Sequence, residues 1–194
     1  MTDSPAGPQI EDAEEPDLDP RTAALAAALL EIDRHAGTDP LTGPRLFALV
    51  LTAPLLQAQP AFAELLDEPT RAAAAADPHH LTSVELEAPP GVEDPREAVL
   101  GIAWPGVDGA AVVADLPAEA WRQGDGPVQL GDPLAGHGLR VAAGALTDGT
   151  TWCAVRGGER EDLLLGPALV PALVEALLAV LGADPTGDQE PGTD

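Results

Sequence analysis

Residues 139–182 read LRVAAGALTDGTTWCAVRGGEREDLLLGPALVPALVEALLAVLG, and this stretch decides the fold class. It begins with two short runs of strand-forming residues, 139–146 and 151–156, which meet at the dipeptide Asp148-Gly149. This dipeptide tolerates the positive φ angles of a tight type I′ turn. The first part of the stretch is therefore predicted to form a β-hairpin.

A two-residue turn also predicts which side chains face one another across the hairpin. In that register Ala145 lies opposite Trp152, and Gly144 lies opposite Cys153. Cross-strand partners share one face of a sheet and must share its volume, so small residues opposite a large ring and a thiol indicate packing.

The second part of the stretch is predicted to form an apolar helix that ends at Gly182. Two neighbouring stripes of apolar residues recur at helical spacing: Leu169, Leu173, Leu177 and Val180, and Val170, Val174, Leu178 and Leu181. Pro167 and Pro171 suit the first turns of the helix, where an amide hydrogen is dispensable. These two prolines, the charge of Glu175 and the acidic flanks oppose a membrane anchor. We therefore predict a core helix beneath a sheet, and no membrane insertion.

The preceding residues supply further helices and strands. Asp19-Pro20 predicts the start of a helix and Gly37 its end. Strands are predicted at 44–51, 81–87, 102–105 and 110–116, a helix-prone segment at 60–76 with an interruption at Pro69, and a helical turn at 95–100. Short turns join only antiparallel neighbours. The predicted fold is α+β, with an antiparallel sheet of five or six strands packed against the N-terminal and C-terminal helices.

The composition predicts one domain with an acidic surface. The chain has 194 residues, of which 45% are hydrophobic, and this is enough for one core of ordinary size. Its formal charge is −24, from 33 acidic and 9 basic residues, and every basic residue is arginine. Nucleic acid and anionic membrane surfaces are poor partners for such a chain, because both attract cationic side chains.

The acidic residues are concentrated at the two ends of the chain. Residues 1–20 hold seven acids and no base, and residues 183–194 hold four acids and no base. Both segments are poor in large apolar residues, so neither can recover the entropy that ordering costs. We predict a disordered acidic tail at 1–20, a single α+β domain at 21–182 and a second disordered acidic tail at 183–194.

Two features predict a cytoplasmic protein. The first twenty residues lack the basic region and the apolar run of a secretory signal. The single cysteine, Cys153, cannot form an internal disulfide, which agrees with a reducing compartment.

Several segments, taken together, resemble a family of small acidic proteins from actinobacteria. They are PRLFALV at 44–50, IAWP at 102–105, LTDG at 146–149 with CAVR at 153–156, and GPALVP at 166–171. The resemblance covers about residues 21–182. That family has no assigned activity, cofactor or catalytic residues. The resemblance therefore implies a single bacterial cytoplasmic domain and carries over no site.

The best candidates for metal ligands are Asp77, His79 and His80, with Glu85 and Glu87 nearby, because imidazoles and carboxylates bind zinc. The spacing argues against a site. Adjacent histidines in an extended chain point to opposite sides, and the two glutamates lie on the face of a strand that is predicted to be solvated. No metal site and no cofactor are predicted.

The candidates for nucleophilic catalysis are few. Cys153 is predicted to lie in the middle of a strand, where a buried packing thiol is the simpler interpretation than a nucleophile. His137 lies in a Gly-rich segment near the hairpin in the sequence, so a Cys153/His137 pair stays open as an alternative. Ser83 has no nucleophile-elbow context, and the segment 124–138 lacks the lysine of a phosphate-binding loop.

Four residues are candidates for protein binding. Arg45, Arg140 and Arg156 lie on or beside predicted strands, where each arginine either pairs with a carboxylate of the chain or receives an anionic group. Trp121 follows a short helical segment, and an exposed tryptophan there indicates a partner surface. Trp104, which precedes a proline, is predicted to anchor the core.

These observations lead to two hypotheses from different classes. The first is a non-catalytic, acidic, cytoplasmic protein-interaction module that binds another protein or itself. The alternative is a small hydrolase, metal-dependent or thiol, with a site near His79/His80 or Cys153/His137. An enzyme needs a pocket in which titratable groups converge, whereas a binding module needs an exposed apolar patch without such convergence. A third interpretation treats the acidic surface only as an adaptation to a salty environment. No small-molecule ligand is indicated.

Overall fold

The structure, a computed structural model, describes residues 18–116, 138–157 and 163–182. Almost all of the two acidic tails lies outside these residues. Trp121 and His137 also lie outside them.

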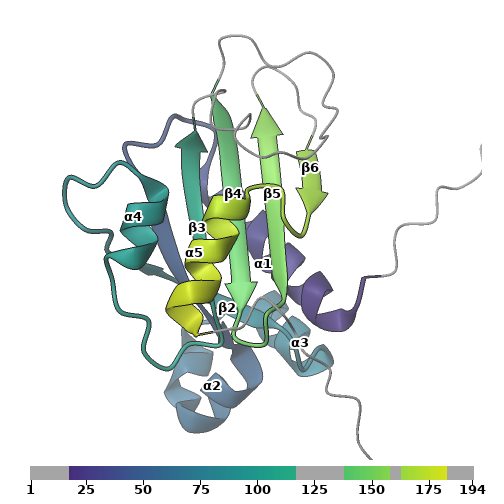
Figure 1. Cartoon of the computed structure of the whole chain (residues 1–194). Helices are drawn as coiled ribbons and strands as arrows, with labels where there is room; N and C mark the ends of the chain where they lie inside the picture. The colour runs from purple at the N-terminus through teal and green to yellow at the C-terminus, as the bar shows by residue number, and fades with distance from the viewer. Residues whose placement is uncertain (1–17, 117–137, 158–162, 183–194) are drawn as a thin grey trace, which may run out of the picture.

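One antiparallel sheet of six strands forms the centre of the molecule (Figure 1). Its order is β2-β1-β3-β4-β5-β6, and every neighbouring pair is antiparallel. The strands are β1 (Arg45–Leu51), β2 (Leu81–Leu86), β3 (Gly109–Leu116), β4 (Leu139–Leu146), β5 (Thr151–Gly157) and β6 (Leu163–Gly166). The predicted α+β fold, with its sheet of five or six strands, is confirmed.

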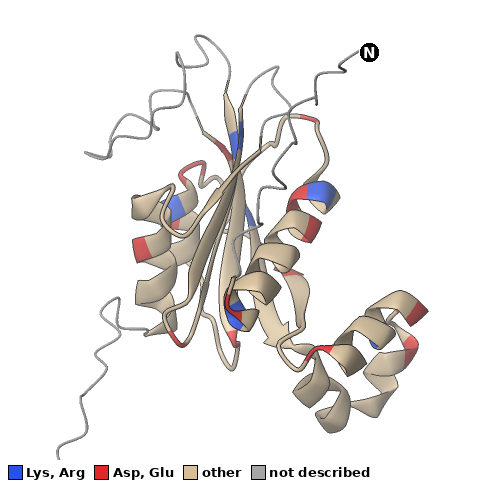
Figure 2. Cartoon of the chain, turned by 90° about the vertical axis from the view of Figure 1, so that its right-hand side faces the viewer, with Lys and Arg blue, Asp and Glu red and all other residues tan. Residues whose placement is uncertain are grey.

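Helices cover both faces of the sheet. Helix α1 (Pro20–Ala36) lies on one face, and α4 (Pro95–Leu100) and α5 (Pro171–Leu181) lie on the other (Figures 1 and 2). Successive strand residues alternate between the two faces, so each strand contributes to two cores. In β3, for example, Val112 belongs to the core under α5, and Val113 belongs to the core under α1.

Local signals decide where α1 begins and ends. The Asp19 carboxylate accepts hydrogen bonds from the amides of Arg21 and Thr22, both at 3.1 Å, and Pro20 occupies the first turn. Gly37 ends the helix with a φ of 75°, a conformation that favours glycine. The prediction of this helix from Asp19-Pro20 to Gly37 is confirmed.

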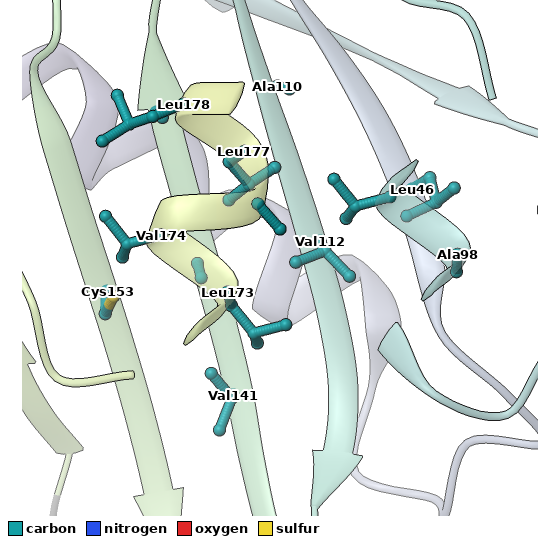
Figure 3. Packing of buried hydrophobic residues seen from close by; sticks show 14 of the residues in the cluster. Leu46, Ala98, Ala110, Val112, Val141, Cys153, Leu173, Val174, Leu177 and Leu178 are labelled. Atoms are coloured by element: carbon teal, nitrogen blue, oxygen red, sulfur yellow. The ribbon is translucent and has the colours of Figure 1, made fainter. Parts of the chain in front are cut away.

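Helix α5 presents most of its apolar surface to the protein core. Leu173, Val174, Ala176, Leu177 and Leu178 are buried, whereas Glu175 is exposed. Figure 3 shows these leucine and valine side chains lying against strand residues of the same core. The predicted core helix beneath a sheet is confirmed, and no helix in the described residues is long and apolar enough to cross a membrane.

The register of the hairpin differs by one residue from the prediction. Gly144 lies opposite Trp152, and Ala143 lies opposite Cys153. The reason is the loop, because only Gly149 has a positive φ (89°), whereas a type I′ turn also requires a positive φ at Asp148.

The observed loop is one residue longer. The Gly149 amide donates to the Leu146 carbonyl at 3.0 Å, and the Leu146 amide donates to the Thr150 carbonyl at 2.8 Å. This is a type I turn closed by a glycine bulge. A one-residue change in loop length shifts every pair of the ladder.

Two further predictions near the core are wrong. Residues 102–105 do not form a strand; Trp104 instead packs on the core from a loop, with its Nε1 donating to the Val99 carbonyl at 3.0 Å. The last helix begins at Pro171 rather than at Pro167, because residues 163–166 pair with β5 as the strand β6 and residues 167–170 form the turn that joins this strand to the helix. Three consecutive leucines carry no alternating pattern, so their pairing was not predicted from sequence.

A helical arm, residues 52–76, connects β1 to β2. It consists of α2 (Thr52–Ala58), the 3₁₀ helix η1 (Pro60–Glu64) and α3 (Glu68–Ala76). The helix-prone segment at 60–76 therefore forms two pieces, but the break lies at residues 65–67 and not at Pro69, which stands in the first turn of α3. Helix α2 was not predicted. Figure 2 shows the arm beyond one end of the sheet, away from the layers that α1 and α5 form.

We expect the contact between β3 and β4 to depend on Gly109. A Cβ atom at this position would lie 2.7 Å from the Ala145 carbonyl oxygen and 2.6 Å from Leu146 Cδ2. The Ala145 carbonyl cannot move away without disturbing the hydrogen bonds between β3 and β4. Gly109→Ala should therefore lower the free energy of unfolding by about 1–3 kcal/mol. Urea denaturation measures this loss.

Gly43→Ala is the matched control. A Cβ atom at Gly43 meets no heavy atom within 4 Å, and this glycine has no positive φ. The change should therefore stay within about 0.5 kcal/mol of the wild type. Equal effects of the two substitutions would contradict the close approach of β3 to β4.

Candidate functional site

The structure brings together three of the four residues predicted for protein binding. Arg45, Arg140 and Arg156 all project from the face of the sheet that α1 covers, because their strand neighbours two positions away belong to the core under α1. All three also lie toward the same end of the sheet, where α1 ends. We call this region the arginine end. Trp121, the fourth residue, lies outside the described residues.

Arg140 holds the loop between α1 and β1 against the sheet. Its side chain is only 10% exposed and pairs with Asp115, its neighbour across the β3–β4 ladder. It also donates to the carbonyls of Gly37 and Asp39, both at 2.7 Å. Asp115 in turn accepts a hydrogen bond from the Leu41 amide at 2.7 Å. The Arg140 guanidinium therefore joins β3, β4 and the loop between α1 and β1, and we call it a structural clamp.

Arg156 pairs with a buried carboxylate of α1. Its partner is Asp33, whose side chain is 4% exposed, whereas the Arg156 side chain is 38% exposed. A pocket of about 430 Å³ lies over this pair and is also lined by Arg140, Asp115 and Thr38. Its two guanidinium groups are each engaged by a carboxylate, so the pocket has no excess positive charge for an anionic ligand.

Arg45 forms a separate ion pair beside this pocket. Its Nε and Nη2 donate to the two carboxylate oxygens of Glu85, both at 2.7 Å, and its guanidinium carbon lies 5.5 Å from the centre of the Phe47 ring. The two-point hydrogen bond from Arg45 holds the pKa of Glu85 below its ordinary value, although burial of the carboxyl acts in the opposite direction.

One histidine of the candidate metal site, His80, has a structural partner for its ring. His80 Nδ1 lies 2.8 Å from the hydroxyl of Thr52, which lies 2.7 Å from the hydroxyl of Thr82. The Thr52 amide also donates to the His80 carbonyl at 2.9 Å. Thr52 opens the helical arm and His80 follows it, so this network closes the base of the arm.

No cluster of three metal-ligating side chains occurs among residues 18–116, 138–157 and 163–182. His79 lines a second pocket, of about 240 Å³, beside the base of the arm, together with Arg21, Asp108 and Asp148. Glu85, another member of the predicted metal set, is engaged by Arg45.

Cys153 lies in the core under α5 with 0% of its surface exposed. Burial raises the pKa of its thiol, against smaller opposing effects from the backbone amides of Val170 and Leu169. A thiol nucleophile needs the reverse, a lowered pKa and access to substrate.

The helical arm is the apolar surface that the sequence interpretation did not single out. Its large apolar side chains are Leu55, Leu56, Phe62, Leu65 and Leu66, and none of them is buried. Leu65 is 77% exposed, the most exposed of the large hydrophobic residues that the structure describes. The sequence gives no signal for this exposure, because large apolar side chains are most often buried.

The fold and these surfaces define a small acidic α+β domain with paired arginines at one end and an apolar helical arm at the other. The chain belongs to the PPA1309-like protein family, whose model matches residues 25–182. This span agrees with the resemblance seen in the sequence, and the family description names no activity. Neither the curated proteins nor the solved structures contain a match to this chain.

The clamp at Arg140 makes a prediction about stability. Arg140→Met keeps the aliphatic stem but leaves the carbonyls of Gly37 and Asp39 and one carboxylate without their donor. The free energy of unfolding should fall by about 2–3 kcal/mol in urea denaturation.

Arg21→Met serves as the comparison for Arg140. Arg21 pairs with Asp148 at a site where its side chain is 54% exposed, so its loss should cost at most about 1 kcal/mol. If the two substitutions have equal effects, Arg140 is an ordinary surface ion pair and not a clamp.

The Arg45–Glu85 pair makes a prediction about pH. Arg45→Met should raise the pKa of Glu85 toward its ordinary value, which NMR titration of the carboxyl carbon measures directly. A carboxyl whose pKa is lowered by folding stabilises the protein above its unfolded-state pKa, and this contribution is lost as the pH falls through the folded-state pKa. The stability difference between wild type and variant should therefore shrink between neutral pH and about pH 3.

Arg96→Met controls for the loss of one positive charge. Arg96 is an exposed residue of α4, on the opposite face of the sheet. The variant Arg96→Met should leave the pKa of Glu85 unchanged in the same NMR titration. A shift of the same size in both variants would mean that net charge, rather than the direct pair, determines the pKa.

Proposed function

We propose that this protein is a non-catalytic, acidic, cytoplasmic protein-interaction module that binds another protein through its helical arm. The observation that carries the proposal is the exposure of Leu65, in an arm whose other large apolar side chains are only partly covered. Burial of a leucine side chain is worth about 1.5–3 kcal/mol, and a partner that covers it gains this free energy. Contiguous exposed apolar surface is typical of interaction sites.

The position of the arm supports this role. Its helices pack chiefly on one another: η1 and α3 both contact α2. Helix α2 contacts β1, from which it continues, and the Thr52 hydroxyl at its start reaches Thr82 of β2. The Arg71 side chain donates to the Ala63 carbonyl at 2.9 Å and so joins α3 to η1. The arm is therefore a small unit that presents its surface beyond the sheet (Figure 2).

The base of the arm supports presentation as a defined unit. The Thr52 side chain is fully buried, and its hydroxyl bridges His80 and Thr82. A surface that is held before the partner arrives costs less ordering entropy on binding. The two ends of the arm are thus fixed to the body of the protein.

The candidate catalytic groups support binding rather than hydrolysis. Cys153 is buried with a raised pKa, and the ring of His80 is engaged by Thr52. In the pocket of about 430 Å³, the carboxylates of Asp33 and Asp115 pair with the guanidinium groups of Arg156 and Arg140. None of these observations on the described residues specifically supports the hydrolase alternative.

An affinity experiment tests the role of the arm. The full chain is immobilised and exposed to lysate of the source organism, beside the variant Leu65→Ser and the control Leu100→Ser. Leu100 is a leucine of α4, 47% exposed and remote from the arm. We expect wild type and control to retain the same partner and the arm variant to lose most of it, as for a central apolar contact.

Circular dichroism of the three proteins establishes that each is folded. Equal retention by Leu65→Ser and wild type contradicts binding through the arm. Absence of any specific partner on the wild type contradicts the interaction module itself.

A further inference from the structure

The chemistry of the arm indicates which kind of partner it accepts. Leu65 lies between Glu64 on one side and Asp67 and Glu68 on the other, and all three acids are exposed. The one basic residue of the arm, Arg71, donates to a backbone carbonyl within the arm itself. The exposed apolar surface is therefore bordered by three acids and one arginine, which leaves an excess of negative charge around it.

A second copy of this chain fits that surface poorly. Each copy has a formal charge of −24, and self-association through two arms would bring Glu64, Asp67 and Glu68 of both copies together. Like charges at an interface reduce both the rate of encounter and the stability of the complex. Charge complementarity instead favours a partner whose contacting segment is basic.

The backbone of the arm restricts the form of that segment. Hydrogen bonds along the arm satisfy its own amides, as in Gln59 to Leu55 at 2.9 Å and Leu65 to Phe62 at 3.0 Å. A helical surface of this kind cannot accept a strand through main-chain pairing, so the contact must be made between side chains. An amphipathic helix provides such side chains in a row along one face.

We infer that the helical arm is the docking site for a basic amphipathic helix of a partner protein. The apolar face of that helix covers Leu65 and the neighbouring leucines, and its lysine or arginine side chains pair with Glu64 and Glu68. This inference rests on the proposed function, because it names the partner of the same surface.

Two synthetic peptides test the inference on the full chain. Both have 18 residues with leucine at positions i, i+3, i+4 and i+7 of a helical pattern; one carries lysine at all other positions and the other carries glutamate. Fluorescence anisotropy measures binding to the wild type. The leucine–lysine peptide should bind, and the leucine–glutamate peptide should not.

Two pairs of variants separate local recognition from the overall charge of the chain. The double variant Glu64→Gln/Glu68→Gln and the control Glu93→Gln/Glu97→Gln each remove two exposed acids, and in each pair one acid lies in the first turn of a helix, α3 or α4. The arm variant should weaken binding of the leucine–lysine peptide at least about fivefold, and the control less than twofold. Leu65→Ser should weaken it about tenfold, and Leu100→Ser should not.

Several results would overturn the inference. One is failure of the leucine–lysine peptide to bind. The others are equal weakening by the two acid variants and unchanged binding to Leu65→Ser, and either of these would indicate non-specific attraction of the peptide to the acidic chain. Dimerisation of the wild type through the arm, measured by sedimentation and abolished in Leu65→Ser, would identify a second copy as the occupant.

The failure of this inference is distinguishable from the failure of the proposed function. Suppose that Leu65→Ser no longer binds the native partner, whereas Glu64→Gln/Glu68→Gln still binds it, also in high salt. This result supports the interaction module and contradicts a basic helix as the partner. If Leu65→Ser still binds the native partner, both binding through the arm and the basic helix are contradicted.

Discussion

The close approach of α1 to the sheet is the contact on which the rest of the structure depends. A Cβ atom on Gly144 of β4 would lie only 3.0 Å from the side chains of Leu25 and Leu29, so the helix lies directly on the strand there. The surrounding strand residues are small as well: Ala111, Ala142 and Ala154 belong to the same core. Small residues on the sheet are what permit a leucine-bearing helix to come this near while the core stays close-packed.

This contact also fixes the arginine end. Because α1 lies flat on β4 and β5, its last turn carries Asp33 to Arg156 and brings the Gly37 carbonyl to Arg140. The loop that follows is then held by Asp115 before it enters β1. The paired arginines are thus consequences of packing, and their main effect is to secure the connection between the first helix and the first strand. The helical arm has no such cover, because it leaves the sheet at the opposite end, beyond the reach of α1 and α5.

The parts of this fold that sequence predicts are those whose causes are local. Asp19, Pro20 and Gly37 define α1 through caps and backbone preferences that operate within a few residues. The hairpin was predicted correctly but its predicted register was wrong by one residue, since the backbone conformation at Asp148 decides between a two-residue and a three-residue loop. The partner of Arg156 is 123 residues away in the chain, so no spacing rule identifies it. Most of the arm was predicted as helix-prone, but the exposure of its apolar side chains was not, because a side chain such as Leu65 is expected to be buried and only the complete fold shows that it is exposed.

The ion pairs engage most of the described arginines and so leave the acidic charge of the chain largely unbalanced. Six of the seven arginines within the described residues donate to a group of the chain itself: Arg21, Arg34, Arg45, Arg71, Arg140 and Arg156. Within the described residues, ion pairs with these arginines engage four carboxylates, and the chain as a whole keeps a formal charge of −24. Such an excess attracts a basic partner over long distances, but long-range attraction alone does not determine where the partner binds. In the proposed complex, the apolar side chains of the arm determine that position, because covering them also removes hydrocarbon area from water.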